Sequence, residues 1–600
     1  MKLLRFYQRW HEESFGRHIS IEDGDSSRSN LLRSPWFVLS FLILLSMTVS
    51  LFYDAWLFTP AGFHDPWMYV GYGYTFDDQG FGGHLKTVYY KLGRIPWVYL
   101  QHLVRKFFSP LISTYILQYS CLWLGVFSVY FTIRRLLGHI PAFLAAVFLC
   151  IYAPFLGSGG ADYHNTLVGP LYAFCFLILT IAAEQEKRAL WWLLLFGCIY
   201  GMTVYTMILY VNFAPILVLH FYVARKMFAK EFISFKNFLL ATFSGVILAT
   251  VICGLVSVAY GYRFLFFIPQ LGLTKTFLSG HWSTSPWWSP WTSGWVLNAY
   301  WLAPLAAMMI FAFGALLFLH RSAKSHPRAL LSHSLNLQFL CLGLVWLFWQ
   351  LLKKDTLNTS YFAYPLIIPF AMSIAASFSL CLSYQFRHQF LPIILGIAAI
   401  IALSFKPFAI QNFFHMSPFI LIFLLFAAVL SLLFFYKRGS ILAVVVLAFA
   451  SIFPVYYERG TVCARDAYLA ITEATQWIYN TYGRYDVPNR AKQIFIWFDE
   501  NSPTDPDCPL RDIGYSLTNT TFDYVHYPYP MPSIQNLKIE DLKGRLSRQE
   551  TKVVVLITKN ENDVKALQNR LEQAGFSLDF VQFREFHQNK IRIPLYVLKG

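Results

Sequence analysis

The chain has 600 residues, of which 56% are hydrophobic, 19% aromatic and 13% charged. A soluble protein has about 25% charged residues, so this composition excludes an ordinary soluble enzyme. The net charge of +16 arises before residue 458, where 30 basic and 14 acidic residues lie. Because these charges flank apolar runs, they are typical of membrane loops that contact lipid headgroups, and we expect no nucleic-acid partner.

Apolar runs of about 20 residues recur as far as residue 457, and each is long enough to cross a membrane as a helix. The stretch 190–224 fits either two short spans or one long bent helix. We predict about thirteen transmembrane helices, at 36–57, 111–133, 140–156, 166–183, 190–207, 208–224, 237–260, 297–319, 335–352, 361–383, 390–405, 417–436 and 440–457.

Lys and Arg residues predict the orientation, because short cytoplasmic loops carry an excess of them. With a cytoplasmic N-terminus, the inner segments hold 20 of these residues and the outer loops hold 10. An odd number of spans then puts the C-terminus outside. We therefore expect a multi-pass protein of a bacterial inner membrane, with a cytoplasmic segment 1–35, a membrane domain 36–457 and a periplasmic or luminal segment 458–600.

Three outer segments are long, at 58–110, 261–296 and 458–600. The first contains a helical apolar pattern at 89–108 beside several cations, which predicts a helix in the headgroup layer. The five Trp residues of the second are typical of an aromatic belt. The third is predicted to be an exported α/β domain, with helices at 464–482 and 561–574 and strands at 492–498, 552–558, 577–585 and 591–598.

Cys463 and Cys508 are the only cysteines of the exported segment. Because an exported domain meets an oxidising compartment, we predict that they form a disulfide. Mass spectrometry of an unreduced digest, from protein purified out of its native membrane, should find the cross-linked peptides. Two alkylated thiols in that digest would contradict the pairing.

Six carboxylates lie on the outer side of the membrane part, and charge at membrane level often marks function. Asp65 lies soon after the first span, in HDPWMY, where it could instead open a helix with Pro66. Asp162 lies in the short loop GSGGADYHN, where it could instead be a solvated cap of the next span. The full set is Asp54, Asp65, Asp77, Asp78, Asp162 and Asp355; of these, Asp77 and Asp78 fit a solvated stretch and Asp54 is a reserve candidate.

Cations on the same side could neutralise a lipid-linked phosphate, and arginine suits this best because its fork makes two hydrogen bonds. The alternative role for each is ordinary headgroup contact. These cations are Lys86, Arg94, Arg263, Lys275, Lys353 and Lys354.

The chain resembles the membrane-integral GT-C glycosyltransferases, in the branch of the protein O-mannosyltransferases and the lipid A aminoarabinose transferase. The resemblance covers the whole architecture, from the cytoplasmic N-terminus to the exported C-terminal domain. Locally it is carried by Asp65 in HDPWMY, by Tyr90 to Arg94 with Pro96, by Tyr130 with Arg134 and Arg135, and by Asp162 with Tyr163.

This resemblance implies an inverting enzyme that moves a sugar from a polyprenyl-phosphate carrier to a hydroxyl or phosphate of a glycan, lipid or protein acceptor. Asp65 would accept the proton of the acceptor hydroxyl, and Asp162 would place the substrate or a cation. Many relatives have paired acidic residues at the position of Asp65, whereas its neighbours here are His64 and Pro66, so a divalent cation is left open. Substrate or its phosphate would contact Arg94, Tyr90, Lys86, His164, Lys353 and Lys354.

Two other classes compete with a transferase. A transporter of lipid-linked sugars predicts internal repeats with broken spans in matching halves, and the sequence has no clear repeat. A polysaccharide ligase or polymerase predicts a His/Arg/Glu cluster in a late outer loop, which the sequence before residue 458 lacks.

Overall fold

The computed structural model describes part of the chain, which forms two compact units, Met1–Ile43 and Leu44–Gly600. Helix α3 (Pro35–Phe52) begins in the first unit, and everything else described below lies in the second. The described residues are 34–52, 57–59, 61, 64–79, 91–152, 155, 162–272, 312, 327–352, 364–383, 464–483, 494–498, 513, 516–517, 553–558, 561–573, 575–577, 579–589 and 591–599.

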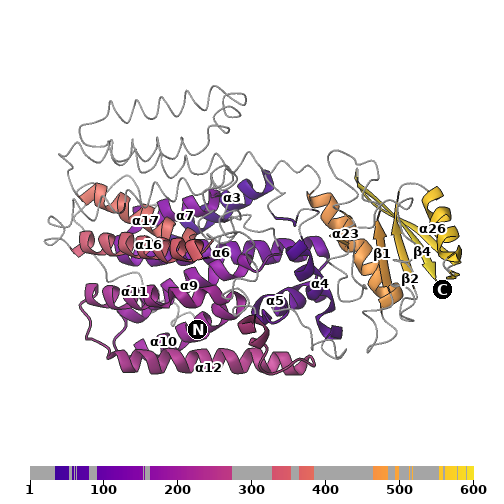
Figure 1. Ribbon diagram of the computed structural model, residues 1–600. Helices are drawn as coiled ribbons and strands as arrows, with labels where there is room; N and C mark the ends of the chain where they lie inside the picture. The colour runs from indigo at the N-terminus through magenta and orange to yellow at the C-terminus, as the bar shows by residue number, and fades with distance from the viewer. Residues whose placement is uncertain are drawn as a thin grey trace, which may run out of the picture. The chain divides into compact units, whose positions relative to one another are not determined.

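Nine of the thirteen predicted spans correspond to described helices. Five stretches, α6, α9, α10, Ile208–Met227 and α12, are long and apolar enough to cross a membrane. The spans expected at 297–319, 390–405, 417–436 and 440–457 lie outside the described residues, apart from Ala312. The nine helices, labelled in Figure 1, are α3, α6 (Pro110–Leu137), α7 (His139–Ile151), α9 (Asn165–Glu184), α10 (Ala189–Thr206), α11 (Ala214–Met227), α12 (Phe235–Ala259), α16 (Pro327–Leu352) and α17 (Tyr364–Ser383).

The stretch 190–224 forms two helices rather than one bent helix. Helix α10 ends at Thr206, and Met207 has an extended backbone with φ −150° and ψ 107°. A short 3-10 helix, η4 (Ile208–Phe213), then leads into α11. Pro215 lies in the first turn of α11, where its missing N–H costs no hydrogen bond. The extended Met207 therefore separates the two helices.

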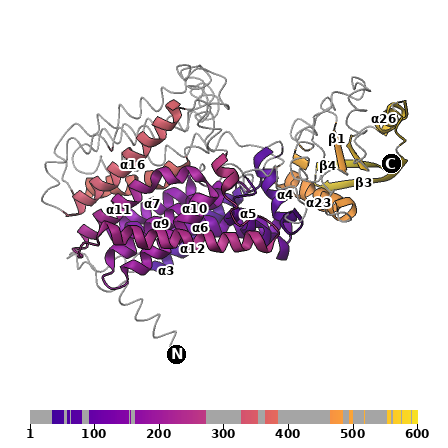
Figure 2. The ribbon, with the colours of Figure 1, turned by 60° about the horizontal axis from the view of Figure 1, so that its bottom comes forward.

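Helix α9 lies at the centre of this bundle and packs against α6, α10 and α11. Helix α12 packs along α10, as Figures 1 and 2 both show, and exposes large apolar side chains such as Phe243. The α10–α12 crossing depends on two glycines. A Cβ at Gly197 or Gly245 would lie 2.0 Å from a carbonyl oxygen of the facing helix. These glycines let the two backbones touch, as small residues do between membrane helices.

The described part of segment 58–110 contains two helices, α4 (His64–Gln79) and α5 (Ile95–Phe107). The sequence predicted the second of them, and Asp65 with Pro66 lies in the first turn of the other. Lys91, Arg94 and Arg105 are buried within the protein. The prediction that these three cations are exposed at the membrane surface is therefore wrong, because neighbouring helices cover their side chains.

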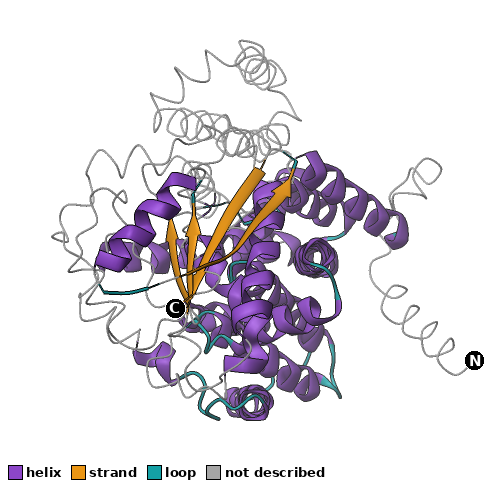
Figure 3. Ribbon diagram, turned by 90° about the vertical axis from the view of Figure 1, so that its right-hand side faces the viewer, coloured by secondary structure: helices purple, strands orange, loops and turns teal. Residues whose placement is uncertain are grey.

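The described elements of segment 458–600 have the predicted order of helices and strands. Helix α23 (Ala464–Ile478) continues into a single π turn, η7 (Tyr479–Gly483). The strands form one sheet (Figure 3). Their order is β1-β2-β4-β3, with β1 and β2 parallel and the other pairs antiparallel. Its strands are β1 (Ile494–Phe498), β2 (Val553–Ile557), β3 (Asp579–Gln588) and β4 (Ile591–Lys599), and α26 (Glu561–Gln573) covers the sheet with Val564, Leu567 and Leu571.

Candidate functional site

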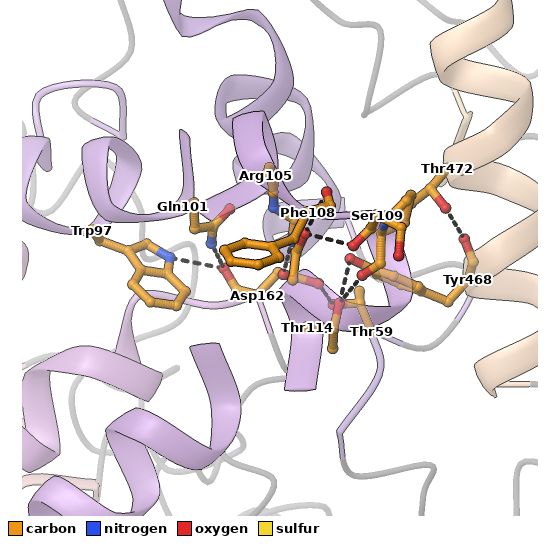
Figure 4. Close-up of polar contacts among 12 residues, drawn as sticks. Thr59, Trp97, Gln101, Arg105, Phe108, Ser109, Thr114, Asp162, Tyr468 and Thr472 are labelled. Carbon is orange, nitrogen blue, oxygen red and sulfur yellow. Dashed lines mark hydrogen bonds and ion pairs between the residues drawn. The ribbon is translucent and has the colours of Figure 1, made fainter. Parts of the chain in front are cut away.

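Asp162 is fully buried in the short segment that precedes α9. Thr59 Oγ1 donates a hydrogen bond to its carboxylate Oδ2 at 2.8 Å, and Arg105 forms an ion pair with Oδ1. Its backbone oxygen accepts hydrogen bonds from Trp97 Nε1 and Gln101 Nε2, both at 2.9 Å (Figure 4). The alternative of a solvated cap is therefore wrong, because this side chain is enclosed and every one of its oxygens is engaged.

The three α5 side chains that hold Asp162 are spaced by four residues. Positions 97, 101 and 105 lie on one face of a helix, one turn apart. Gly73 of α4 makes room for them, because a Cβ there would lie 2.9 Å from Arg105 Cδ and 3.1 Å from Gln101 Oε1. The local sequence thus places polar side chains on one face of α5, and Gly73 lets this face pack closely against α4.

Arg94 forms a second buried cluster with groups from two other segments. Its Nη1 donates to the hydroxyl of Tyr69 and contacts Nδ1 of His164. Lys91 lies nearby, with Nζ 3.3 Å from Met68 Sδ. Since a guanidinium can only donate, Nδ1 of His164 must be the acceptor, and the neutral ring then carries its proton on Nε2.

The surroundings of His164 are electropositive. Burial lowers the pKa of the imidazole well below its ordinary value, and the charges of Arg94 and Lys91 lower it further. In the described part of the chain, the buried Nε2 has no hydrogen-bond partner. Helix α9 begins at the next residue, and a helix N-terminus adds partial positive charge. This cluster therefore offers an N–H donor in a place that favours an anion.

Asp65 is the second residue of α4. Met68 and Tyr69 follow it by three and four residues, so position 65 lies on the same helix face, one turn earlier. Those two residues contact Lys91 and Arg94. The backbone of α4 thus brings position 65 to the side of the helix that carries the cation cluster.

The structure does not bring all the predicted site residues together. Arg94 and His164 come together, whereas Asp162 lies beside Arg105. Among the described residues, no group of three or more His, Cys, Asp or Glu side chains could hold a metal ion. Tyr90, Lys86, Lys353, Lys354, Cys463 and Cys508 lie outside the described residues.

Sequence reasoning missed several residues of the site. The spacing of Trp97, Gln101 and Arg105 was a usable signal, because polar or amphipathic groups recur there at one face of a predicted helix. Tyr69 follows Asp65 by one helical turn and could have been found in the same way. Thr59 carries no comparable signal.

No protein-family model and no curated protein sequence matches this chain. Among solved structures, the apo oligosaccharyltransferase of Archaeoglobus fulgidus is similar, with 13% identity, 86% of this chain and 69% of that chain covered, and a TM-score of 0.41. AglB from Archaeoglobus fulgidus, in complex with an inhibitory peptide and a dolichol-phosphate, has 12% identity, coverages of 92% and 73%, and a TM-score of 0.38. ArnT from Cupriavidus metallidurans, bound to undecaprenyl phosphate, has 11% identity, coverages of 94% and 98%, and a TM-score of 0.47.

These solved structures are GT-C membrane glycosyltransferases, the superfamily that the sequence resembles.

Proposed function

We propose that the chain is an inverting membrane glycosyltransferase that uses a sugar donor linked to a polyprenyl phosphate. The observation that carries the proposal is the cluster of Arg94, Lys91 and His164 at the start of α9. Two buried cations and a neutral imidazole with a free Nε2–H suit a phosphate group, because each can donate a hydrogen bond to an anionic oxygen.

The reaction assigned to this site is a single displacement. An acceptor oxygen attacks the anomeric carbon, the bond from that carbon to the phosphate oxygen breaks, and the configuration inverts. The lipid phosphate leaves with one more negative charge, which Arg94, Lys91 and the Nε2–H of His164 would stabilise. Asp65 would take the proton of the acceptor hydroxyl as the new bond forms. Asp162 would position Arg105 and the end of α5 rather than touch the substrate.

The proposal is tested by incubating membranes that contain the chain with radiolabelled polyprenyl-phosphate sugars. We expect the label to leave the lipid and appear in a covalent product, with the configuration at the anomeric carbon inverted. Label that crosses the membrane while it stays on the lipid would instead indicate a transporter. Extension of one lipid-linked glycan by another would indicate a polymerase or ligase.

Replacing Arg94 with lysine should weaken binding of undecaprenyl phosphate about tenfold or more, because the charge remains but the two-pronged contact is lost. Binding is measured by titration of the purified protein in detergent. Lys106→Met is the matched control, since Lys106 is exposed and pairs with Asp77; its affinity should stay within about twofold of wild type. Equal effects of the two changes would mean that Arg94 does not hold the lipid phosphate.

A further inference from the structure

Tyr468 belongs to α23 of the exported segment, yet its side chain is fully buried beside the membrane helices. Its hydroxyl lies 3.1 Å from Thr114 Oγ1 on α6 (Figure 4). Its ring lies between two aromatic residues, 5.3 Å from Trp67 and 5.4 Å from Phe58 by ring centroids. Trp67 follows Asp65 by two residues, and Phe58 precedes Thr59, the hydrogen-bond donor to Asp162. Tyr468 therefore packs against residues that adjoin both candidate carboxylates.

The hydroxyl of Tyr468 also lies close enough to the Asp162–Arg105 ion pair to affect the pKa of both partners. Burial raises the pKa of the Asp162 carboxyl, and the charge of Arg105, the hydrogen bond from Thr59 and the nearby Tyr468 hydroxyl oppose this rise without cancelling it. Burial raises the pKa of the Tyr468 hydroxyl itself, so the hydroxyl stays protonated and can donate. A phenylalanine would fill the same aromatic space without placing a polar group there. Because burying a hydroxyl is costly unless it is hydrogen-bonded, its presence points to a role for these contacts.

Helix α23 is held at the same time by the sheet of the exported segment. Asn589 Nδ2 donates to Asp466 Oδ2 at 2.9 Å, and Trp477 packs against Phe586 with ring centroids 5.6 Å apart. Helix α23 thus contacts β3 and the turn after it through Asp466 and Trp477, and it contacts the site through Tyr468. The position of Tyr468 is set by the exported segment, while its contacts are with α4 and α6.

We infer that Tyr468 is a positioning residue of the transferase site, and that the exported segment completes this site through it. The hydroxyl bonds to Thr114 of α6, and the ring packs against Trp67 at the start of α4, which carries Asp65, and against Phe58, which precedes the Asp162 partner Thr59. This inference rests on the proposed function. It gives the exported segment, which contains no recognisable catalytic motif, a specific part in the reaction.

Tyr468→Phe should lower kcat about tenfold, because small displacements of a reacting group are costly, while KM for the donor stays within about twofold. The phosphate cluster of Arg94 and His164 is left intact. Tyr482→Phe is the matched control, since Tyr482 lies in the same segment and, among the described residues, its hydroxyl bonds only to the exposed Gln582, at 3.4 Å; it should leave kcat and KM unchanged. A wild-type kcat in Tyr468→Phe, or an equal change in KM, would overturn the inference.

The pH profile supplies a readout that loss of packing would not change. Because the nearby Tyr468 hydroxyl lowers the pKa of the Asp162 carboxyl, its removal favours the protonated form, so the acidic limb of kcat should move to higher pH in Tyr468→Phe. The charged or titratable groups around Asp162 in the described part of the chain are Arg105, Tyr74 and Tyr468. Arg105 and Tyr74 are unchanged in the variant, and a profile identical to wild type would contradict the inference.

A melting experiment separates this inference from the proposed function, because it needs no substrate. Thr114→Val removes the other hydroxyl of the contact from α6. If Tyr468 and Thr114 are coupled, the double variant should melt at nearly the temperature of the less stable single variant. Additive decreases in melting temperature would show that the two side chains are not in contact. Coupled melting in a protein that transfers no sugar from any polyprenyl donor would refute the proposed function and leave the contact standing.

Discussion

Replacing Asp162 with asparagine should destabilise the protein by about 3–5 kcal/mol, because the change leaves a buried arginine without its counter-charge. Both side chains of the Asp162–Arg105 pair are fully inaccessible to solvent. Asparagine keeps the shape of the side chain, so the loss would report charge rather than packing. Thermal unfolding of the purified protein in detergent, followed by tryptophan fluorescence, measures the effect as a lower melting temperature.

Asp77→Asn is the matched control for this prediction. Asp77 is partly exposed and pairs with the exposed Lys106 and, at 3.0 Å, with Nε2 of His102; its pair with Lys106, like other surface pairs, contributes about 0–1 kcal/mol. In the Asp162→Asn background, Arg105→Met should recover part of the lost stability, because no uncompensated charge remains. Equal, small effects at Asp77 and Asp162 would show that the ion pair does not hold the end of α5.

Asp65→Asn should lower turnover roughly 100-fold or more, because asparagine is nearly isosteric but cannot accept the proton of the acceptor hydroxyl. Folding and binding of the lipid phosphate should be preserved, since Arg94, Lys91 and His164 are unchanged. Single-turnover transfer from a radiolabelled polyprenyl-phosphate sugar measures the chemical step directly. Titration with undecaprenyl phosphate verifies that the variant still binds.

Asp78→Asn is the control for Asp65→Asn, because Asp78 lies near the opposite end of α4. Its turnover should stay close to that of wild type. Normal turnover in Asp65→Asn would exclude Asp65 as the base. A large loss in Asp54→Asn or Asp78→Asn would then identify the carboxylate that takes its place.

The sequence by itself determined most of the helices and strands that the structure describes, but not helix α4. Hydrophobic runs and apolar periods depend only on neighbouring residues, so they predicted α6, α9 and α12 to within a few residues. The strands of segment 458–600 were found for the same reason. The sequence also singled out Arg94, Asp162 and His164 as polar groups near the outer ends of the helices.

Only the tertiary structure decided which of these polar groups meet. Arg94 contacts His164 across 70 positions, Arg105 pairs with Asp162 across 57, and Tyr468 reaches Thr114 across 354. No local pattern encodes such contacts, because they arise when separate helices pack. The same packing buries cations that their local sequence suggested were at the membrane surface. Burial then sets the neutral state of His164 and encloses Asp162, and both depend on atoms contributed by distant parts of the chain.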